Sequence, residues 1–425
     1  MFSFCKPVSS KRRFLPFRKL NEEFSFTLYE RADAINTHDW EAITHHKTIF
    51  LEKEYLQIVE GSEYTKLMYR YVIVYCDKKP CGIIYFQIAD FKAGVFGELL
   101  NKEVETIKER RRNLFERYID SNKHEVMLRL FTCGNNLVSG EYGFLFDKKL
   151  SAKRAHEVLL ELINVVSKEE KLRGTISAIL LKDYYKPLQP KAPFLENNYY
   201  EFSVEPNMIV NIPPQVNSLE EYIGLFSKKY RNRAKGILKG LHGIDVRYLD
   251  LEEVVSYEKD MYRLYENIFE KAKFKLIKLP RNYFSEVKKL FHKNFTVKAF
   301  FLNDTLVAFG TCFLKGDGCM EAHYVGFDYE LNAQHNLYQN LLYSLIKEAI
   351  VHKRTRVNLG RTAAEIKTTV GAKPEDLTCY IKPQNTISKI IQKPFIAFLQ
   401  PAAWIPRNPF KEEEAENLKE ELRSQ

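Results

Sequence analysis

Long apolar runs are missing from this sequence of 425 residues. No stretch approaches the roughly 20 apolar residues that a membrane-spanning helix needs. The basic N-terminal stretch also lacks the continuous apolar segment of a signal peptide. We therefore expect a cytoplasmic protein that does not cross a membrane. The chain is too long for one ordinary hydrophobic core, and its length predicts two domains of roughly 200 residues each.

Closely spaced cysteines are missing as well. The seven cysteines are scattered along the chain and odd in number, which indicates reduced thiols rather than a disulfide framework or a zinc site. The sequence also contains no P-loop, no dinucleotide-binding glycine fingerprint and no serine–histidine–aspartate order. We therefore expect no metal and no tightly bound cofactor.

Positive charge is abundant and unevenly placed. The formal net charge is +10, and residues 1–20 hold six basic and no acidic side chains. A basic body with a basic arm indicates a phosphate-bearing ligand, a nucleic acid or an anionic membrane face. Charge by itself leaves these partners open, although we do not expect DNA.

The two halves of the chain show a similar order of predicted elements. The first half predicts a helix at 51–59, a hairpin at 69–88 and a charged helix at 97–122. A strand at 126–132, a helix at 151–167 and a strand at 175–181 follow. The second half predicts a capped helix that continues through a basic stretch, at 218–235. Three strands at 297–302, 306–314 and 319–327, a long helix at 332–352 and a short strand at 356–359 follow. This repeated order predicts two similar α/β domains.

Several short stretches form a recognisable pattern. They are His38–Trp40, Phe50–Leu56, Gly140–Gly143, Ser227–Arg233, Tyr324–Asp328, and Gly360–Arg361 followed by Lys367 and Gly371–Ala372. Together they resemble the Fem-like branch of the GNAT superfamily, whose members are often labelled peptidoglycan-biosynthesis or recognition proteins. The resemblance covers roughly residues 35–385. It implies an α/β fold of tandem GNAT-like domains with mixed sheets, an activated acyl donor and an amine acceptor.

The resemblance and the composition divide the chain into four expected segments. They are a basic and aromatic arm at 1–34, a first GNAT-like domain at 35–190, a second and catalytic GNAT-like domain at 191–386, and an apolar, proline-rich segment with a charged tail at 387–425.

An acid and a histidine stand two residues apart on the predicted strand 319–327. Because side chains alternate across a strand, Glu321 and His323 are expected on one face. Either could take the proton from an attacking amine, directly or through water. Sheets also hold such pairs as satisfied hydrogen-bonding groups, so both interpretations stay open. Tyr338 stands early in the next helix, where some GNAT enzymes have a general-acid tyrosine, and a packing role is its alternative.

The resemblance places the donor at the start of the long helix. There the residues Gln334, His335 and Asn336 are expected to meet donor phosphates, since a helix N-terminus favours anions. GNAT enzymes usually have a glycine-rich loop at this place, and none is present here. The backbone can then approach the donor less closely, which argues against acetyl-coenzyme A.

Basic residues supply the remaining candidates. Arg361, after a strand end, and Lys367, from the family motif, are expected to hold donor or acceptor oxygens. A loop-bracing ion pair with Glu365 is the alternative for Lys367. Lys229 and Arg231 are expected to contact substrate, with a solvated helix face as their alternative. Glu141, in the first-half motif, is the last expected substrate contact.

Three hypotheses of function remain open. The first is an N-acyltransferase that takes an acyl group from acyl-coenzyme A or an acyl carrier protein. Its acceptor would be a lipid-like amine, such as a sphingoid or sulfonolipid base. Aromatic and basic residues interleave near both ends, which favours peripheral contact with an anionic membrane. For residues 387–410 the alternative is that they cover the core of the second domain. The second is a Fem-type transferase that uses aminoacyl-tRNA in peptidoglycan synthesis, although no heptad hairpin for tRNA is visible. The third is a non-catalytic binding protein.

Overall fold

The computed structural model describes most of the chain. The described residues are 17–44, 48–61, 67–92, 127–140, 142–171, 174–185, 191–271, 277–314, 318–401 and 403–411. The predicted helix at 97–122, Glu141, residues 1–16 of the N-terminal arm and residues 412–425 of the charged tail lie outside them.

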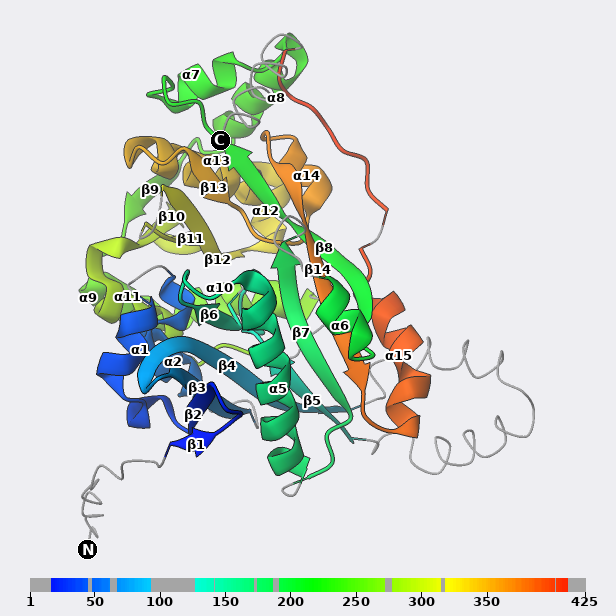
Figure 1. Ribbon diagram of the computed structural model, residues 1–425. Coiled ribbons are helices and arrows are strands. Elements are labelled where there is room, and N and C mark those ends of the chain that lie inside the picture. The colour runs from blue at the N-terminus through cyan, green and yellow to red at the C-terminus, as the bar shows by residue number, and fades with distance from the viewer. Residues whose placement is uncertain are drawn as a thin grey trace, which may run out of the picture.

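One mixed sheet of 14 strands forms the centre of the molecule (Figure 1). The strands are β1 (Arg18–Lys19), β2 (Phe24–Tyr29), β3 (Met68–Cys76), β4 (Lys79–Lys92), β5 (Met127–Cys133), β6 (Phe144–Phe146), β7 (Ala178–Tyr185), β8 (Tyr200–Asn211), β9 (Ile244–Tyr248), β10 (Phe295–Leu302), β11 (Thr305–Phe313), β12 (Cys319–Phe327), β13 (Arg356–Asn358) and β14 (Lys373–Pro383). Their order is β1-β2-β3-β4-β5-β7-β14-β8-β13-β12-β11-β10-β9, and β6 pairs with β4.

Each half of the sheet repeats one pattern. An antiparallel run, β2 to β5 in the first half and β9 to β12 in the second, ends in one parallel pair. The parallel pairs are β5–β7 and β12–β13, and a helix crosses between the two strands of each. β14 lies between β7 and β8, antiparallel to both, and joins the halves. The expected α/β class with mixed sheets and two similar halves is confirmed.

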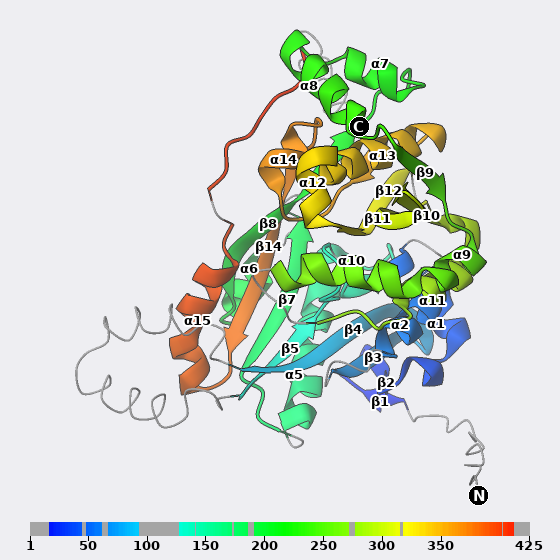
Figure 2. The ribbon, with the colours of Figure 1, turned by 180° about the vertical axis from the view of Figure 1, so that it is seen from behind.

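Helices cover both faces of the sheet. They are α1 (Thr37–Thr44), α2 (Lys53–Glu60), α5 (Ala152–Lys171), α6 (Lys191–Glu196), α7 (Leu219–Gly224), α8 (Lys228–Lys239), α9 (Leu251–Ser256), α10 (Glu258–Lys271), α11 (Tyr283–Phe291), α12 (Tyr329–His335), α13 (Leu337–Val351), α14 (Ala364–Thr368) and α15 (Thr386–Leu399). The crossing helices α5 and α13 pack on one face, whereas α10 and α11 cover the other (Figures 1 and 2).

Local chemistry explains the tight turns. Asp77 and Lys78 connect β3 to β4 with φ of 49° and 62°, and Asn303 and Asp304 connect β10 to β11 with 48° and 60°. Two successive residues with positive φ make the two-residue hairpin turn whose twist matches the strands, and Asn and Asp tolerate that conformation. The first turn therefore consists of two residues, with Cys76 and Lys79 paired across it.

Two helices that the sequence predicted as continuous are broken. Ser218 caps α7 by accepting a hydrogen bond from the Glu221 N–H at 3.1 Å, but α7 ends at Gly224. The basic run forms a separate helix, α8, so it does not continue α7. The long predicted helix is likewise divided into α12 and α13, because Asn336 adopts the left-handed conformation with φ of 50°.

A single apolar cluster extends through both halves on the α10 face of the sheet. It contains Trp40, Tyr55 and Tyr71 from the first half together with Tyr283 and Phe313 from the second. The halves therefore share a core. A separate apolar cluster forms where α15 buries Ile391 and Phe395 against β5, β7 and β14. Among the described helices, none combines the length and the apolar composition that crossing a bilayer requires.

Candidate active site

The parallel pairing of β12 with β13 covers only the first three residues of β12, because β13 ends at Asn358. Cys319, Met320 and Glu321 pair with β13, and the register ends there. On its other edge β12 stays paired with β11 as far as Phe327. Within the part of the chain that the structure describes, β12 thus has no strand partner on the β13 side beyond Glu321. The peptide groups of that edge are left for another partner.

A β-bulge lies where the two strands separate. Ala322 pairs with Cys312 and Val325 with Gly310, so β12 holds one residue more than β11 across this step. The Thr311 hydroxyl fills the bulge, since it accepts from the Tyr324 N–H at 3.0 Å and donates to the Tyr324 carbonyl at 2.8 Å. The bulge interrupts the regular alternation that led us to expect Glu321 and His323 on one face.

His323 stands in this bulge and is surrounded by aromatic rings. Its ring stacks on Phe50 at 5.7 Å and on Tyr283 at 5.7 Å, and it meets Phe313 edge-on at 4.9 Å between centroids. Burial among these rings lowers the pKa of His323 to about 3. The imidazole is therefore uncharged at neutral pH.

Two tyrosines extend the polar contacts of His323 into the first half. The His323 Nε2 lies 2.6 Å from the Tyr283 hydroxyl, which lies 3.2 Å from the Tyr55 hydroxyl. A phenol has one proton, so Tyr283 donates to only one of these neighbours. If it donates to His323, the imidazole proton is on Nδ1. If it donates to Tyr55, Nε2 holds the proton and Nδ1 is a free acceptor. Reversing the two hydrogen bonds thus changes what His323 offers to a ligand.

Glu321 lies near the first half but has different neighbours from His323. The Cys319 thiol is 3.7 Å from its Oε1. Burial, and next the charge of Glu321, raise the pKa of Tyr142. Glu321 therefore lies where residues of the first half approach the start of the strand separation, and His323 lies among the aromatic rings.

The junction of α12 and α13 contains the three residues expected to bind donor phosphates. Gln334 is exposed at the end of α12, whereas His335 is buried with its Nδ1 2.8 Å from the Gly240 carbonyl. Asn336 forms the left-handed break between the helices. The Asn332 side chain accepts from the Tyr338 N–H at 2.9 Å. One of the N–H groups that a phosphate would use at the start of α13 is therefore already bonded.

Tyr338 is a packing residue in this structure. Its ring lies 5.6 Å from that of Phe327, and burial raises its pKa. A raised pKa keeps the phenol protonated, which a general acid also requires, so the geometry leaves the predicted role open.

Lys367 braces the loop that follows β13. Its buried Nζ donates to the carbonyl oxygens of Leu359 at 2.8 Å and Gly360 at 3.1 Å, and also to that of Arg361. Burial lowers the pKa of Lys367 to about 7. Glu365, the alternative partner named from the sequence, pairs instead with Arg407 at 2.7 Å.

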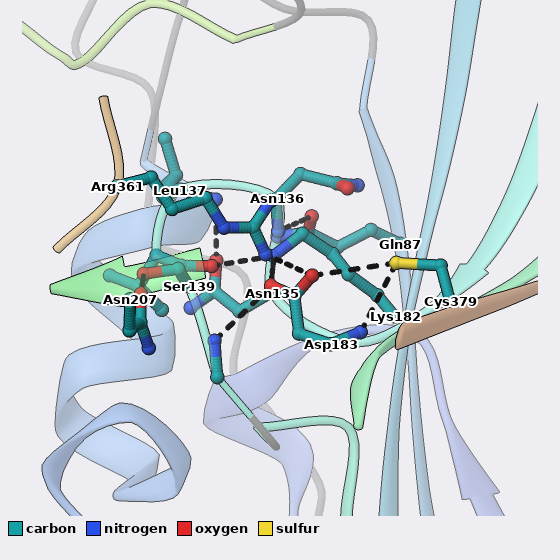
Figure 3. A network of polar contacts seen from close by, with 12 residues as sticks. Gln87, Asn135, Asn136, Leu137, Ser139, Lys182, Asp183, Asn207, Arg361 and Cys379 are labelled. Carbon is teal, nitrogen blue, oxygen red and sulfur yellow. Dashed lines mark hydrogen bonds and ion pairs between the residues drawn. The ribbon is translucent and has the colours of Figure 1, made fainter. Parts of the chain in front are cut away.

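Arg361 reaches across to the first half (Figure 3). Its guanidinium forms an ion pair with Asp183, a fully buried carboxylate at the end of β7. Lys182 also pairs with Asp183, and the Gly140 N–H donates to the carboxylate at 3.1 Å. Although burial opposes ionisation, the charges of Arg361 and Lys182 hold the pKa of Asp183 below its usual value.

The other expected substrate contacts are not part of these clusters. Lys229 is exposed and Arg231 is half-buried on α8, which packs on α7 and α13 at one end of the molecule (Figure 1). Sequence reasoning missed Tyr283 and Asp183. Tyr55 lies in the predicted helix 51–59, and that position was the one available signal.

Comparisons with known proteins give the fold. No protein-family model matches the sequence, and no curated protein matches it. Among solved structures, a crystal structure of FemX matches 86% of this chain and 99% of its own, with a TM-score of 0.50 and 12% identity. The chain shares the fold of this FemX structure.

Two further solved structures match with lower scores. A tandem GNAT protein from the clavulanic acid biosynthesis pathway matches 85% of this chain and 98% of its own, with a TM-score of 0.47 and 8% identity. A GCN5-related N-acetyltransferase from Sphaerobacter thermophilus matches 84% and 95%, with a TM-score of 0.38 and 10% identity. At such identities the match to FemX establishes the fold alone, and the chemistry must be argued from the site.

Proposed function

We propose that this chain is an N-acyltransferase whose active site lies where β12 leaves β13. The observation that carries the proposal is the coincidence of three features at one point. The strands separate after Glu321, a bulge follows, and an uncharged His323 stands in that bulge. A freed strand edge offers N–H groups to a carbonyl oxygen, and the imidazole offers a proton acceptor.

The proposed reaction needs one proton carrier. An uncharged amine attacks the carbonyl carbon of a thioester that lies along the free edge of β12. The amine proton passes to His323 as the C–N bond forms, and the C–S bond breaks as the thiolate leaves. His323 then returns that proton to the sulfur. The products are an amide and a free thiol, and His323 ends in its starting state.

The low pKa of His323 limits when it can hold the proton. An imidazole with a pKa of about 3 stays neutral in the empty site. It becomes a useful base only while negative charge develops on the thioester oxygen or the sulfur, because a nearby anion favours the imidazolium. The proton transfer is then confined to the transition state.

A thioester on a protein-borne arm suits the α12–α13 junction better than a coenzyme A thioester. Asn332 already bonds the Tyr338 N–H, and no glycine lets the backbone approach a pyrophosphate closely. The arm of an acyl carrier protein has no pyrophosphate, so we propose an acyl carrier protein thioester as the first co-substrate. Acyl-coenzyme A, whose pyrophosphate is the same for every acyl length, is the second.

The proposed acceptor is an amphiphilic amine at a membrane face, such as a sphingoid or sulfonolipid base. Phe17 is 56% exposed and adjoins Arg18 and Lys19, which suits the headgroup region of an anionic leaflet. The C-terminal segment offers less support, because α15 uses Ile391 and Phe395 to cover the sheet. Peripheral membrane contact on the cytoplasmic side is therefore proposed for the N-terminal arm.

A Fem-type reaction is the second candidate, and one surface favours it. Lys228, Lys229, Arg233 and Lys235 are exposed along α8, so this helix presents a basic face. Such a face suits a nucleic-acid backbone, as an aminoacyl-tRNA donor would require. Ester aminolysis at His323 would follow the same proton path, with a ribose oxygen as the leaving group.

Product analysis with a panel of donors tests the proposal. The full chain is incubated with short- and long-chain acyl-coenzyme A, acyl carrier protein thioesters and charged tRNA, each with and without sphingoid bases or peptidoglycan precursors. We expect amine-dependent thiol release together with one amide per thiol. Transfer from charged tRNA alone would favour the Fem reaction. Donor binding without product from any of these would identify a non-catalytic binding protein.

A further inference from the structure

A loop of the first half reaches the strand that holds His323. It connects β5 to β6, and its described residues are 134–140 and 142–143; we call it the first-half loop. The Leu137 carbonyl accepts a hydrogen bond from the Tyr324 hydroxyl at 2.7 Å. Tyr142 of the same loop lies 4.7 Å from Phe50, between ring centroids, and Phe50 stacks on His323. The loop therefore touches both the neighbour of His323 in the chain and the ring on which His323 stacks.

Buried charges hold the first-half loop at its other end. Asp183 accepts from the Gly140 N–H at 3.1 Å, and Lys182 donates to the Val138 carbonyl at 2.7 Å while it pairs with Asp183. Arg361, from the loop after β13, completes the cluster (Figure 3). Asp183 is thus the acceptor shared by two cations and by the loop backbone, and these groups come from both halves.

We propose that Asp183 is a positioning residue that keeps the first-half loop against β12 and thereby keeps His323 in contact with its aromatic neighbours. Among the described residues, the Asp183 carboxylate forms its hydrogen bonds and ion pairs with Gly140, Lys182, Arg361 and Cys379 rather than with His323 or β12. Its effect on His323 therefore passes through the loop. The importance for catalysis rests on the proposed function, whereas the state of His323 is measured without any substrate.

The backbone at Asp183 indicates which substitution is informative. Its φ is 66°, in the left-handed region that Asn also tolerates. Asp183→Asn therefore preserves shape and backbone while it removes the charge. Lys182 and Arg361 then repel each other without a counter-charge, and the loop loses its charged acceptor.

The control removes a buried charge of the same kind elsewhere in the first half. Glu170 pairs with Arg70 at 2.5 Å, and both side chains are 4% exposed. Glu170→Gln should also destabilise the fold, but the Glu170–Arg70 pair has no contact with the first-half loop among those found. A change common to both variants reports stability, and a change confined to Asp183→Asn reports the loop.

The measured quantity is the rate at which diethyl pyrocarbonate modifies His323, read by peptide mass spectrometry at neutral pH. In the wild type the shielded imidazole should react slowly. Loss of a hydrogen bond to a charged group typically changes an equilibrium about tenfold or more, so we expect at least a tenfold faster reaction in Asp183→Asn. Glu170→Gln should react at the wild-type rate.

Tyr324→Phe provides a second route to the same answer. It removes only the hydroxyl that binds the Leu137 carbonyl and keeps the ring, so it decides the question if Asp183→Asn fails to fold. We expect it to accelerate modification of His323 as well. Wild-type rates in folded Asp183→Asn, or in Tyr324→Phe if the former does not fold, would overturn the proposal.

The same measurements separate this inference from the proposed function. If the wild type transfers acyl groups but His323 reacts equally in all variants, the positioning role fails and the enzyme stands. If His323 becomes reactive in Asp183→Asn but no donor is turned over by the wild type, the positioning role stands and the enzyme proposal fails.

Discussion

Replacement of Tyr283 by Phe tests the hydrogen bonds around His323 most sharply. The substitution keeps the ring that stacks on His323 and removes the hydroxyl that lies 2.6 Å from His323 Nε2 and 3.2 Å from the Tyr55 hydroxyl. Nε2 then lies among aromatic rings without its phenol partner. An unsatisfied buried polar group costs about 1–3 kcal/mol. His323 should therefore occupy its working orientation and tautomer less often.

The expected kinetic effect follows from that cost. If the lost free energy falls on the transition state, kcat/KM for acyl transfer should drop by roughly 10- to 100-fold. We expect most of the loss in kcat, because the hydroxyl is not proposed to bind the substrate. The assay is steady-state thiol release at saturating amine, with the donor varied.

Tyr262→Phe is the matched control. Tyr262 is buried in the same cluster, and its hydroxyl donates to the Leu279 carbonyl at 3.0 Å rather than to His323. It should lower the melting temperature with little change in kcat. Equal kcat for the wild type and folded Tyr283→Phe would refute the reasoning. Equal losses of kcat in Tyr283→Phe and Tyr262→Phe would mean that the loss comes from lower stability and not from the contact with His323.

Three further outcomes follow from the structure. Glu321→Gln should lower turnover by roughly 100-fold if Glu321 shares the proton transfer, and unchanged turnover in the folded variant would leave His323 as its carrier. Burial lowers the pKa of Lys367 to about 7, so the folded chain releases a proton that the unfolded chain holds up to a pH of about 10.4. The free energy of unfolding should therefore rise from pH 7 to 10 in the wild type relative to Lys367→Met, and parallel pH profiles would contradict this. Deletion of residues 1–16, which leaves β1 in place, should reduce co-sedimentation with anionic liposomes at low salt, and binding that persists after the deletion would exclude residues 1–16 as the contact.

Local signals were enough for most of the strands and helices. The predicted strands 306–314 and 319–327 agree within one residue with β11 and β12. Such features depend on neighbours within a few residues. The breaks at Asn336 and after Gly224 were missed, because both flanking segments have good helical patterns and the break depends on one backbone conformation or on tertiary packing.

The candidate site was predictable only in part. His323 stood out as a histidine on an apolar strand. Its partner Tyr283 and the tyrosine that Tyr283 contacts next, Tyr55, are 228 positions apart in the chain. The bulge at His323 depends on Thr311 from the neighbouring strand. Asp183 gave no signal, since its role arises only when β7, the first-half loop and Arg361 meet. Contacts between distant segments carry no local periodicity, so one sequence cannot reveal them.

The most direct test of the central claim compares the wild type with His323→Ala under identical conditions. Thiol release and amide product are measured together, over the donor panel and with the amine present or absent. The account predicts amine-dependent release of one thiol per amide in the wild type and a loss of roughly 100- to 10,000-fold in the folded His323→Ala variant. Undiminished amide formation by that variant would contradict it.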